Sequence, residues 1–240
     1  MSAIRQPPGA VDTNVTIRLR WANRARNSLG LARPCKAVQK TLGLFLLGGT
    51  TLLGVGALLH PMLTGDAAAE LTTIAASPHF RAIHLAMLTG SALIIAGVWV
   101  RALACGPGEG FRFGIAFGLI DLGLALNAYD IAFMARAGTR LAAAYATGAV
   151  TAAPLFDAMH DAGLMYARFG NVIVALGALV LGAAEQPTRK VAAALAWVAA
   201  AGGLIGLASP ETSLLILAPV ALLSGWQVVT GLGALNILHT

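Results

Sequence analysis

Four of the five histidines lie at or near the ends of apolar stretches of the sequence. His60 closes the first stretch, His79 and His84 open the second, and His160 lies near the start of the fourth. Imidazole is the commonest side-chain metal ligand, and its neutral nitrogen suits zinc, copper and haem iron. Helical bundles bind metals and cofactors through facing side chains on different helices. These positions therefore predict a metal or haem site between helices.

Asp130 is expected at the same depth as His84 and His160, near the outer ends of three helices. Two histidines and a carboxylate with open coordination positions are typical of zinc, copper or non-haem iron sites, whereas two histidines across a flat gap suit a b-type haem. We expect His84 and His160 to bind the cofactor, with Asp130 and His60 as further metal ligands. No short metal-binding motif supports either site, and polar residues that only bridge helices are the alternative interpretation.

Asp121 and Arg168 lie near mid-depth on consecutive antiparallel helices. An unpaired charge at that depth costs about 2.5–3.5 kcal/mol on insertion scales, so we expect the two side chains to form an ion pair. Asp161, on the same helix as Arg168, is the alternative partner. The predicted role of the pair is structural, and a proton relay is the alternative role.

The composition defines the elements that must position these residues. Of the 240 residues, 58% are hydrophobic and 11% are charged, and the mean hydropathy is +0.77. Soluble domains are about 45–50% apolar and about 25% charged. This balance excludes a disordered chain, a nucleic-acid-binding domain and a conventional soluble enzyme. It predicts an all-α polytopic integral membrane protein, because backbone in lipid must satisfy its own hydrogen bonds.

The apolar stretches divide residues 41–240 into a predicted bundle of six membrane-spanning helices. About 20 apolar residues cross the hydrocarbon layer of a bilayer. Two predicted outer loops are longer than the rest, and the second of them is rich in alanine, which favours a surface or re-entrant helix at residues 136–154. The spans are expected at about residues 41–60, 82–104, 112–135, 155–183, 190–208 and 212–236.

The distribution of Lys and Arg predicts the orientation. Residues 1–40 contain eight of the sixteen Lys and Arg residues and a single acid, Asp12. Twelve of the sixteen fall in predicted inner segments and three in outer segments. By the positive-inside rule, both termini are cytoplasmic and the protein is a multi-pass protein of the cytoplasmic (inner) membrane. The basic charge is explained by this topology, so no nucleic-acid partner is expected.

The predicted N-terminal region is a basic cytoplasmic arm, residues 1–40. Residues 14–33 alternate Arg with apolar side chains, so they form either an amphipathic helix on anionic lipid or an unstructured arm. Cys35 and Cys105 fall on the cytoplasmic side, where thiols stay reduced, and no chemistry is assigned to them.

Three functions are consistent with these features. The first is a membrane-embedded redox subunit that binds a haem or a transition metal near the outer face. The second is a non-catalytic accessory subunit of a larger membrane complex, in which the polar residues only connect helices. The third is a small-solute or ion transporter that uses Asp121, Asp130 and Arg168. The lack of mid-span prolines other than Pro219 disfavours the third, since transporters often contain broken helices.

Overall fold

The computed structural model describes residues 36–103, 107–187, 189–208 and 218–237. They belong to one compact unit, Lys36–Thr240, and no β-strand occurs among them. The predicted basic arm therefore lies outside the described residues except for its last five positions, which begin the first helix, and Cys35 and Cys105 lie outside them as well. The elements are α2 (Lys36–Leu59), α3 (Ala67–Ala76), α4 (Phe80–Leu103), α5 (Pro107–Phe133), the π-helical segment η1 (Met134–Gly138), α6 (Thr139–Ala146), α7 (Ala152–Glu185), α8 (Lys190–Ala208) and α9 (Ala218–Ala234).

Four helical segments of the described chain are long and apolar enough to cross a membrane: Lys36–Leu59, Phe80–Leu103, Gly110–Ala146 and Ala152–Glu185. Only 28% to 33% of the most apolar window of each is buried inside the protein. Large side chains such as Leu58 and Leu103 are 86% and 82% exposed. An apolar surface of this extent is typical of helices that face lipid rather than water. The prediction of an all-helical protein is confirmed for the described residues, with four helices that could span a membrane.

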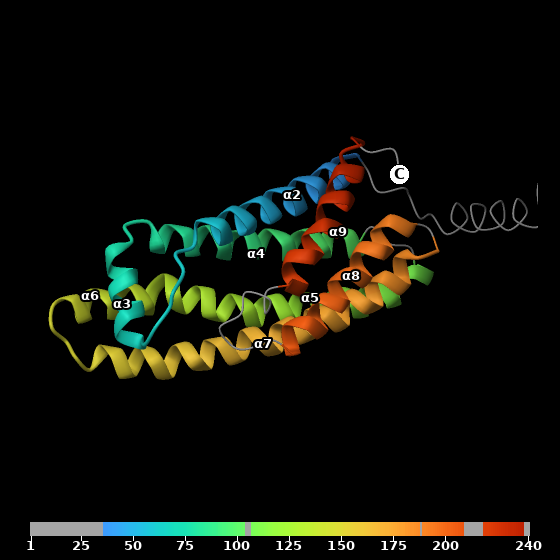
Figure 1. Ribbon diagram of the computed structural model, residues 1–240. Helices are drawn as coiled ribbons and strands as arrows, with labels where there is room; N and C mark the ends of the chain where they lie inside the picture. Colours follow the sequence, from blue (N-terminus) through green and yellow to red (C-terminus); the bar gives the residue numbers. More distant parts are fainter. Residues whose placement is uncertain (1–35, 104–106, 188, 209–217, 238–240) are drawn as a thin grey trace, which may run out of the picture. The chain divides into compact units, whose positions relative to one another are not determined.

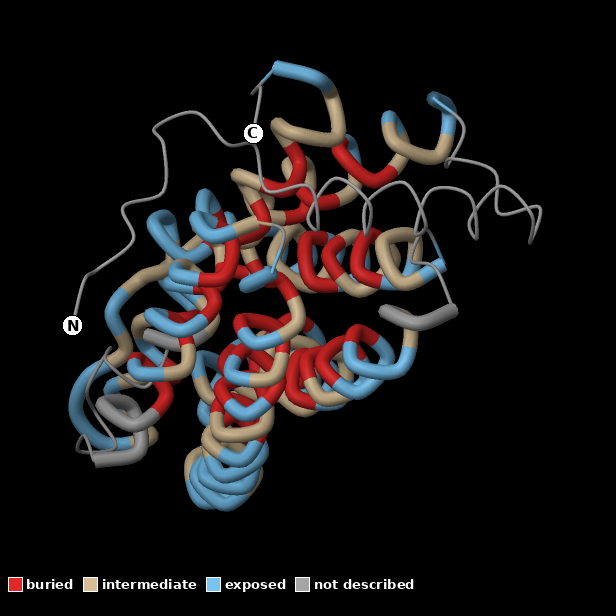
Figure 2. Tube along the Cα trace, turned by 90° about the vertical axis from the view of Figure 1, so that its right-hand side faces the viewer, coloured by how far each residue is buried: buried red, intermediate tan, exposed pale blue. Residues whose placement is uncertain are grey.

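The long helices form two antiparallel pairs, α2 with α4 and α5 with α7 (Figure 1). Helices α8 and α9 follow α7, and α9 packs back against α2. Figure 2 shows the buried residues on the inner sides of the helices and the exposed residues on the outside. The main core contains large side chains from several helices, among them Leu46, Ile94, Phe117, Leu181 and Trp226.

Glycines set the spacing within each pair. A Cβ atom on Gly49 would lie 2.7 Å from the carbonyl oxygen of Gly90, so α2 and α4 touch through their backbones. On the second pair, a Cβ atom on Gly170 would lie 2.5 Å from the carbonyl oxygen of Gly123. Small residues allow such close contact between helices in a membrane, where van der Waals packing is the main attraction. These contacts fix the register in which polar side chains meet.

We expect Gly123→Ala to lower the free energy of unfolding by about 1–3 kcal/mol, the usual effect of overpacking. The added methyl group would fall on the Gly170 carbonyl oxygen and lie 2.8 Å from the Val174 nitrogen. Gly118→Ala is the matched control on the same helix, since its Cβ would meet nothing within 4 Å. It should be neutral or stabilising, because alanine favours helix over glycine. Unfolding of both variants in mixed micelles of detergent and dodecyl sulfate measures the difference. Equal midpoints would contradict a role for the glycine seam, the contact of Gly123 with Gly170, in packing α5 against α7.

A smaller core closes one end of the unit, where α3 runs across the ends of the long helices (Figure 1). The segment between the first two spans was expected as a loop but contains α3, whose N-cap Asp66 accepts a hydrogen bond of 2.9 Å from the Ala69 N–H. The alanine-rich segment was predicted as a surface or re-entrant helix at residues 136–154. In the structure, α6 continues α5 through η1 and ends at Ala146. The small core consists of Leu71, Ile74, Phe80, Phe133, Met134, Ala142, Ala152 and Phe156.

Candidate functional site

His60 and His84 meet at this end of the unit. His60 follows α2 directly, on the face that carries Gly49 and Gly56, and His84 lies in the second turn of α4. The two Nε2 atoms are 3.2 Å apart, and the ring centroids are 4.8 Å apart at an interplanar angle of 67°. The ring of Phe80 packs on both imidazoles, and His84 is only 3% exposed. The arrangement brings two imidazole nitrogens together beside an aromatic ring.

The protonation of the two rings follows from their partners. His84 Nδ1 lies 2.9 Å from the carbonyl oxygen of Phe80. Because a carbonyl only accepts, Nδ1 carries the proton and the neutral His84 ring has a lone pair on Nε2. His60 Nε2–H then donates to His84 Nε2. The backbone of Phe80 thus points the His84 lone pair at His60.

His160 lies between two carboxylates. Its Nδ1 is 3.5 Å from Oδ1 of Asp130 on α5, and its Nε2 is 3.8 Å from Oε2 of Glu70 on α3. The imidazole also stacks on Phe156, with ring centroids 5.2 Å apart. All three polar side chains are between 15% and 18% exposed. As an imidazolium, His160 would be an ion-pair partner for both carboxylates.

Two backbone features position Asp130. A Cβ atom on Gly163 would collide with the Asp130 carboxylate, so only glycine at that position lets the carboxylate reach His160. The π-helical segment η1 begins four residues after Asp130, and π-turns inside α-helices are frequent at functional sites. The carboxylate therefore lies at the junction of a glycine contact and an irregular helical turn.

The four residues predicted to form the site gather at this end, but their contacts differ from those expected. His84 contacts His60, whereas His160 contacts Asp130 and Glu70. Asp130 and His160 are close enough to His60 for their charges to influence its pKa, so the histidine pair and the His160 group are neighbours. Among the described residues, no group of three His, Cys, Asp or Glu side chains is arranged to hold a metal ion. His79 is exposed and contributes nothing to the site.

Two contributors were not predicted as site residues, Glu70 and Phe80. Glu70 lies in the first turn of α3, and only the packing of α3 over α7 brings it to His160. Phe80 lies one helical turn before His84, a spacing that does place its ring and carbonyl next to the imidazole. The sequence therefore contained a signal for Phe80 and none for Glu70.

Burial shifts the pKa of two titratable groups that lie outside the spans, His60 and Glu70. Desolvation lowers the pKa of His60, opposed by the Pro61 carbonyl and by the negative charge of Asp130. Desolvation also raises the pKa of Glu70, opposed by His160. His60 is therefore neutral at neutral pH, which is the form that binds metals.

The ion pair predicted between Asp121 and Arg168 does not form. Both Asp121 carboxylate oxygens are buried, and neither has a hydrogen-bond partner in the part of the chain that the structure describes. Gly123 lies against Gly170 and Asp130 against Gly163, so Asp121 is level with residue 172 rather than with Arg168. Asp121 and Arg168 also each precede a seam glycine by two residues, about 200° of rotation, so both point away from the α5–α7 contact.

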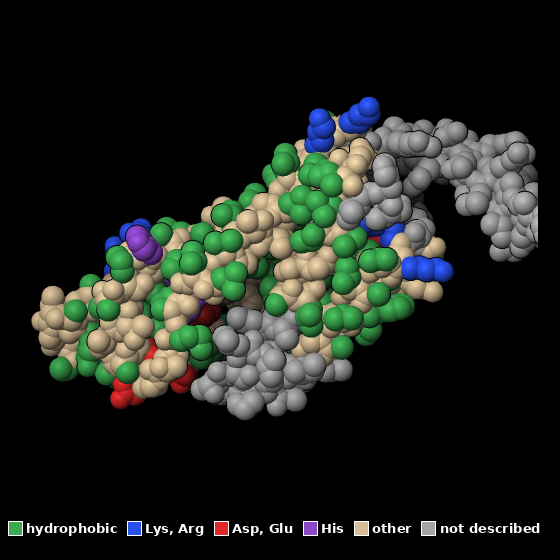
Figure 3. All heavy atoms as spheres, turned by 45° about the horizontal axis from the view of Figure 1, so that its top comes forward, with side chains coloured by type: hydrophobic (Ala, Val, Ile, Leu, Met, Phe, Trp, Pro, Cys, Tyr) green, Lys and Arg blue, Asp and Glu red, His purple; other side chains and the backbone are tan. Residues whose placement is uncertain are grey.

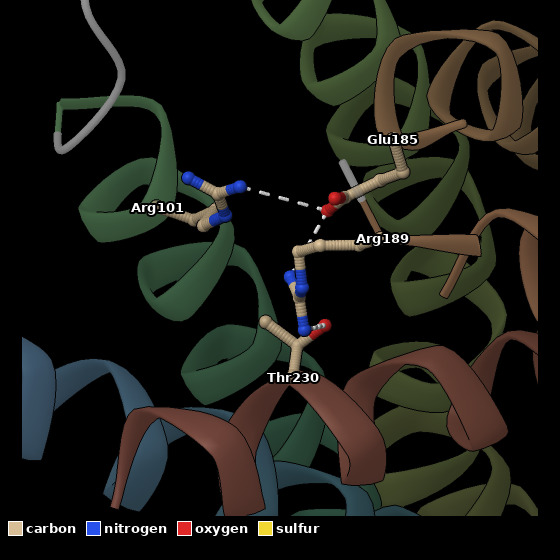
Figure 4. Close-up of polar contacts among 4 residues, drawn as sticks. All are labelled: Arg101, Glu185, Arg189 and Thr230. Atoms are coloured by element: carbon tan, nitrogen blue, oxygen red, sulfur yellow. Dashed lines mark hydrogen bonds and ion pairs between the residues drawn. The ribbon is translucent and has the colours of Figure 1, made fainter. Parts of the chain in front are cut away.

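A second polar cluster lies at the opposite ends of the helices (Figure 4). Glu185 on α7 is fully buried, with Oε1 3.6 Å from Arg101 of α4 and 3.2 Å from Arg189, which precedes α8. Arg189 also donates to Thr230 of α9 at 3.4 Å, and Arg101 lies over the ring of Phe113, 4.9 Å from its centroid. The Glu185 carboxylate therefore connects α7 to α4 directly and to α9 through Arg189.

The fold and the two clusters define a helical membrane protein whose titratable side chains are concentrated at the ends of its helices. On the face in Figure 3, Asp and Glu side chains gather at the end that carries α3 and α6, and several Lys and Arg side chains lie at the other end. Comparisons with protein families, with characterised proteins and with solved structures find no match for this chain. Its function must therefore be inferred from the geometry of the site.

Proposed function

We propose that the protein is a membrane-embedded metal-binding subunit in which His60 and His84 supply two nitrogen ligands to a transition-metal ion. The observation that carries the proposal is the separation of 3.2 Å between the two Nε2 atoms. With metal–nitrogen bonds of about 2.0–2.1 Å, two ligands of a tetrahedral ion lie about 3.3 Å apart. The pair is therefore already at the spacing of two metal ligands.

Metal binding requires only a tautomer change at His60. The lone pair of His84 Nε2 is already available, because its Nδ1–H donates to Phe80. His60 must move its proton from Nε2 to Nδ1, and the Pro61 carbonyl beside the ring is an acceptor for that proton. Hydrogen bonds from the second ring nitrogen to a backbone carbonyl are the usual outer-shell support of metal-bound histidine.

The geometry favours a metal ion over a b-type haem. Two axial histidines must lie on opposite faces of the macrocycle, but the rings of His60 and His84 are 4.8 Å apart and meet edge to face. A haem between His84 and His160 would have to displace His60 from Nε2 of His84. With two protein nitrogens, the ion keeps open positions for water or a small ligand, and a bound copper or iron ion would make the subunit redox-active.

The test is metal binding by the purified full-length protein in detergent. After treatment with a chelator, the protein is titrated with Cu²⁺, Zn²⁺ and Co²⁺ and its metal content is measured. We expect one ion per chain and, with Cu²⁺, an electron paramagnetic resonance spectrum with hyperfine coupling to two imidazole nitrogens. A Soret band in the protein as isolated would favour the haem, and a protein that binds neither would favour the accessory subunit.

We further propose six spans, with α8 and α9 as the fifth and sixth, and with both termini in the cytoplasm. The support is the excess of Lys and Arg in the predicted inner segments together with the apolar character of α8 and α9. A reporter fused after Thr240 should be cytoplasmic and one inserted near Thr73 should be periplasmic. The opposite pair of signals would reverse the orientation and place the histidines on the cytoplasmic side.

A further inference from the structure

Asp121 lies in the middle of the span formed by α5, and no charged side chain in the described part of the chain pairs with it. Both carboxylate oxygens are shielded from solvent, and no described residue forms a hydrogen bond with either. The nearest charged side chains along α5 are Arg112 and Asp130, each nine residues away, which is about 13 Å along the helix axis. The carboxyl group is therefore far from the charged ends of its own helix.

Within residues 36–103, 107–187, 189–208 and 218–237, the neighbouring helices supply no counter-ion to Asp121. On the α4 side, the uncharged indole of Trp99 lies beside the carboxyl group without completing a hydrogen bond. On the α7 side, the seam of Gly123 and Gly170 turns Asp121 away from the contact. Arg101 of α4 and Arg189, which precedes α8, are engaged with Glu185. Arg81 at the other end of α4 and Lys190 at the start of α8 are exposed.

An ionised carboxylate in this position would be a buried charge without a counter-ion among the described residues. Such a group is destabilised strongly in an apolar medium and takes up a proton instead of remaining ionised. We propose that Asp121 is an intramembrane proton-binding site that is a neutral carboxylic acid in the resting protein. The proposal is independent of the metal site, and a side chain that binds and releases a proton within the membrane is a requirement for proton-coupled transport.

A neutral acid within the bilayer has a diagnostic reaction with lipid-soluble carbodiimides. The acid proton goes to one carbodiimide nitrogen, and a carboxylate oxygen forms a bond to the central carbon, which gives an O-acylisourea. An acyl shift from oxygen to nitrogen then yields a stable N-acylurea, with all atoms of both reactants retained. We expect dicyclohexylcarbodiimide to modify Asp121 in the folded protein in detergent or lipid.

Two measurements test the proposal on the full-length protein at mildly acidic pH. Mass spectrometry of peptides from the treated wild-type protein should show the adduct at Asp121. Infrared spectra should show a protonated-carboxyl stretching band that is lost in Asp121→Asn and retained in Asp66→Asn, whose carboxylate caps α3 and is exposed.

Each measurement can overturn the proposal. An infrared band unchanged by Asp121→Asn would show that Asp121 is ionised. Absence of the adduct on wild-type protein would do the same without any variant, so the test remains decisive if Asp121→Asn does not fold. Neither result depends on whether the chain binds metal.

Discussion

Replacing His84 with alanine is expected to lower the affinity for the bound transition-metal ion by at least about 100-fold. Loss of an outer-shell hydrogen bond to a metal ligand already weakens binding by 10–100-fold, and His84 is proposed as a ligand itself. Removal of one imidazole leaves a single nitrogen from His60 at the site. Isothermal titration calorimetry of chelator-treated protein with Zn²⁺ measures the change in the dissociation constant.

His79→Ala is the matched control, because His79 is also an imidazole, lies five residues before His84 and is exposed. It should bind metal as the wild type does. His60→Ala should match His84→Ala, and the double variant should lose little more than either single variant, since both remove the same site. Equal affinity of His79→Ala and His84→Ala would show that binding occurs elsewhere.

The same affinity should fall as the pH is lowered, because protons compete with the metal for the imidazole nitrogens. Burial lowers the pKa of His60, so protons compete with the metal for this imidazole only at pH values below the ordinary imidazole pKa of about 6.5. The free energy of unfolding should also fall as the pH is lowered. Because the pKa of His60 is lower in the folded protein, the unfolded chain binds this proton more readily, and stability is lost as the pH falls below about 6.5.

Glu185→Gln is expected to lower the free energy of unfolding by about 3 kcal/mol, at the lower end of the range for breaking a buried ion pair. The amide keeps the volume of the side chain but removes the charge that neutralises Arg101 and Arg189. The carboxylate is fully buried, whereas the arginines are 17% and 23% exposed, and that exposure moderates the effect. The detergent unfolding assay described for the glycine variants measures it.

Lys190→Gln is the control for the loss of a charge at the same end, since Lys190 is exposed and should leave the unfolding midpoint unchanged. Adding Arg189→Met to Glu185→Gln should recover part of the stability, because one uncompensated cation is removed. Unchanged stability in Glu185→Gln would show that the cluster contributes nothing to the connection between α4, α7 and α9.

The helical membrane class was predictable because it depends on composition and on the length of apolar stretches, which are properties of the chain alone. The meeting of His60 with His84 was also within reach of the sequence. His60 follows Gly56 by four residues and Gly49 by eleven, so all three lie on one face of a helix. A pair of helices joined through that face brings His60 to the start of its partner.

The predicted pairing of Asp121 with Arg168 failed because depth was estimated and rotation was not. Distance from the helix ends placed both residues near the middle of the membrane, but the direction of a side chain depends on which face packs. The glycines two positions later indicate that face, and both charged residues point away from it. Glu70 was not identified because its contact with His160 depends on how a short helix folds over the bundle.

The π-helical segment Met134–Gly138 acts as a phase shift between two parts of one continuous helix. A π-turn holds one residue more than an α-turn, so the side chains after it are rotated by about 100° relative to an uninterrupted α-helix. This rotation points Ala142 of α6 at the small core under α3, while Asp130 still faces α7. The residues before the π-turn therefore present the face that packs against α7, and the residues after it present the face that packs in the small core under α3. Deletion of a single residue in this turn would rotate α6 relative to the small core while leaving the contact between α5 and α7 unchanged.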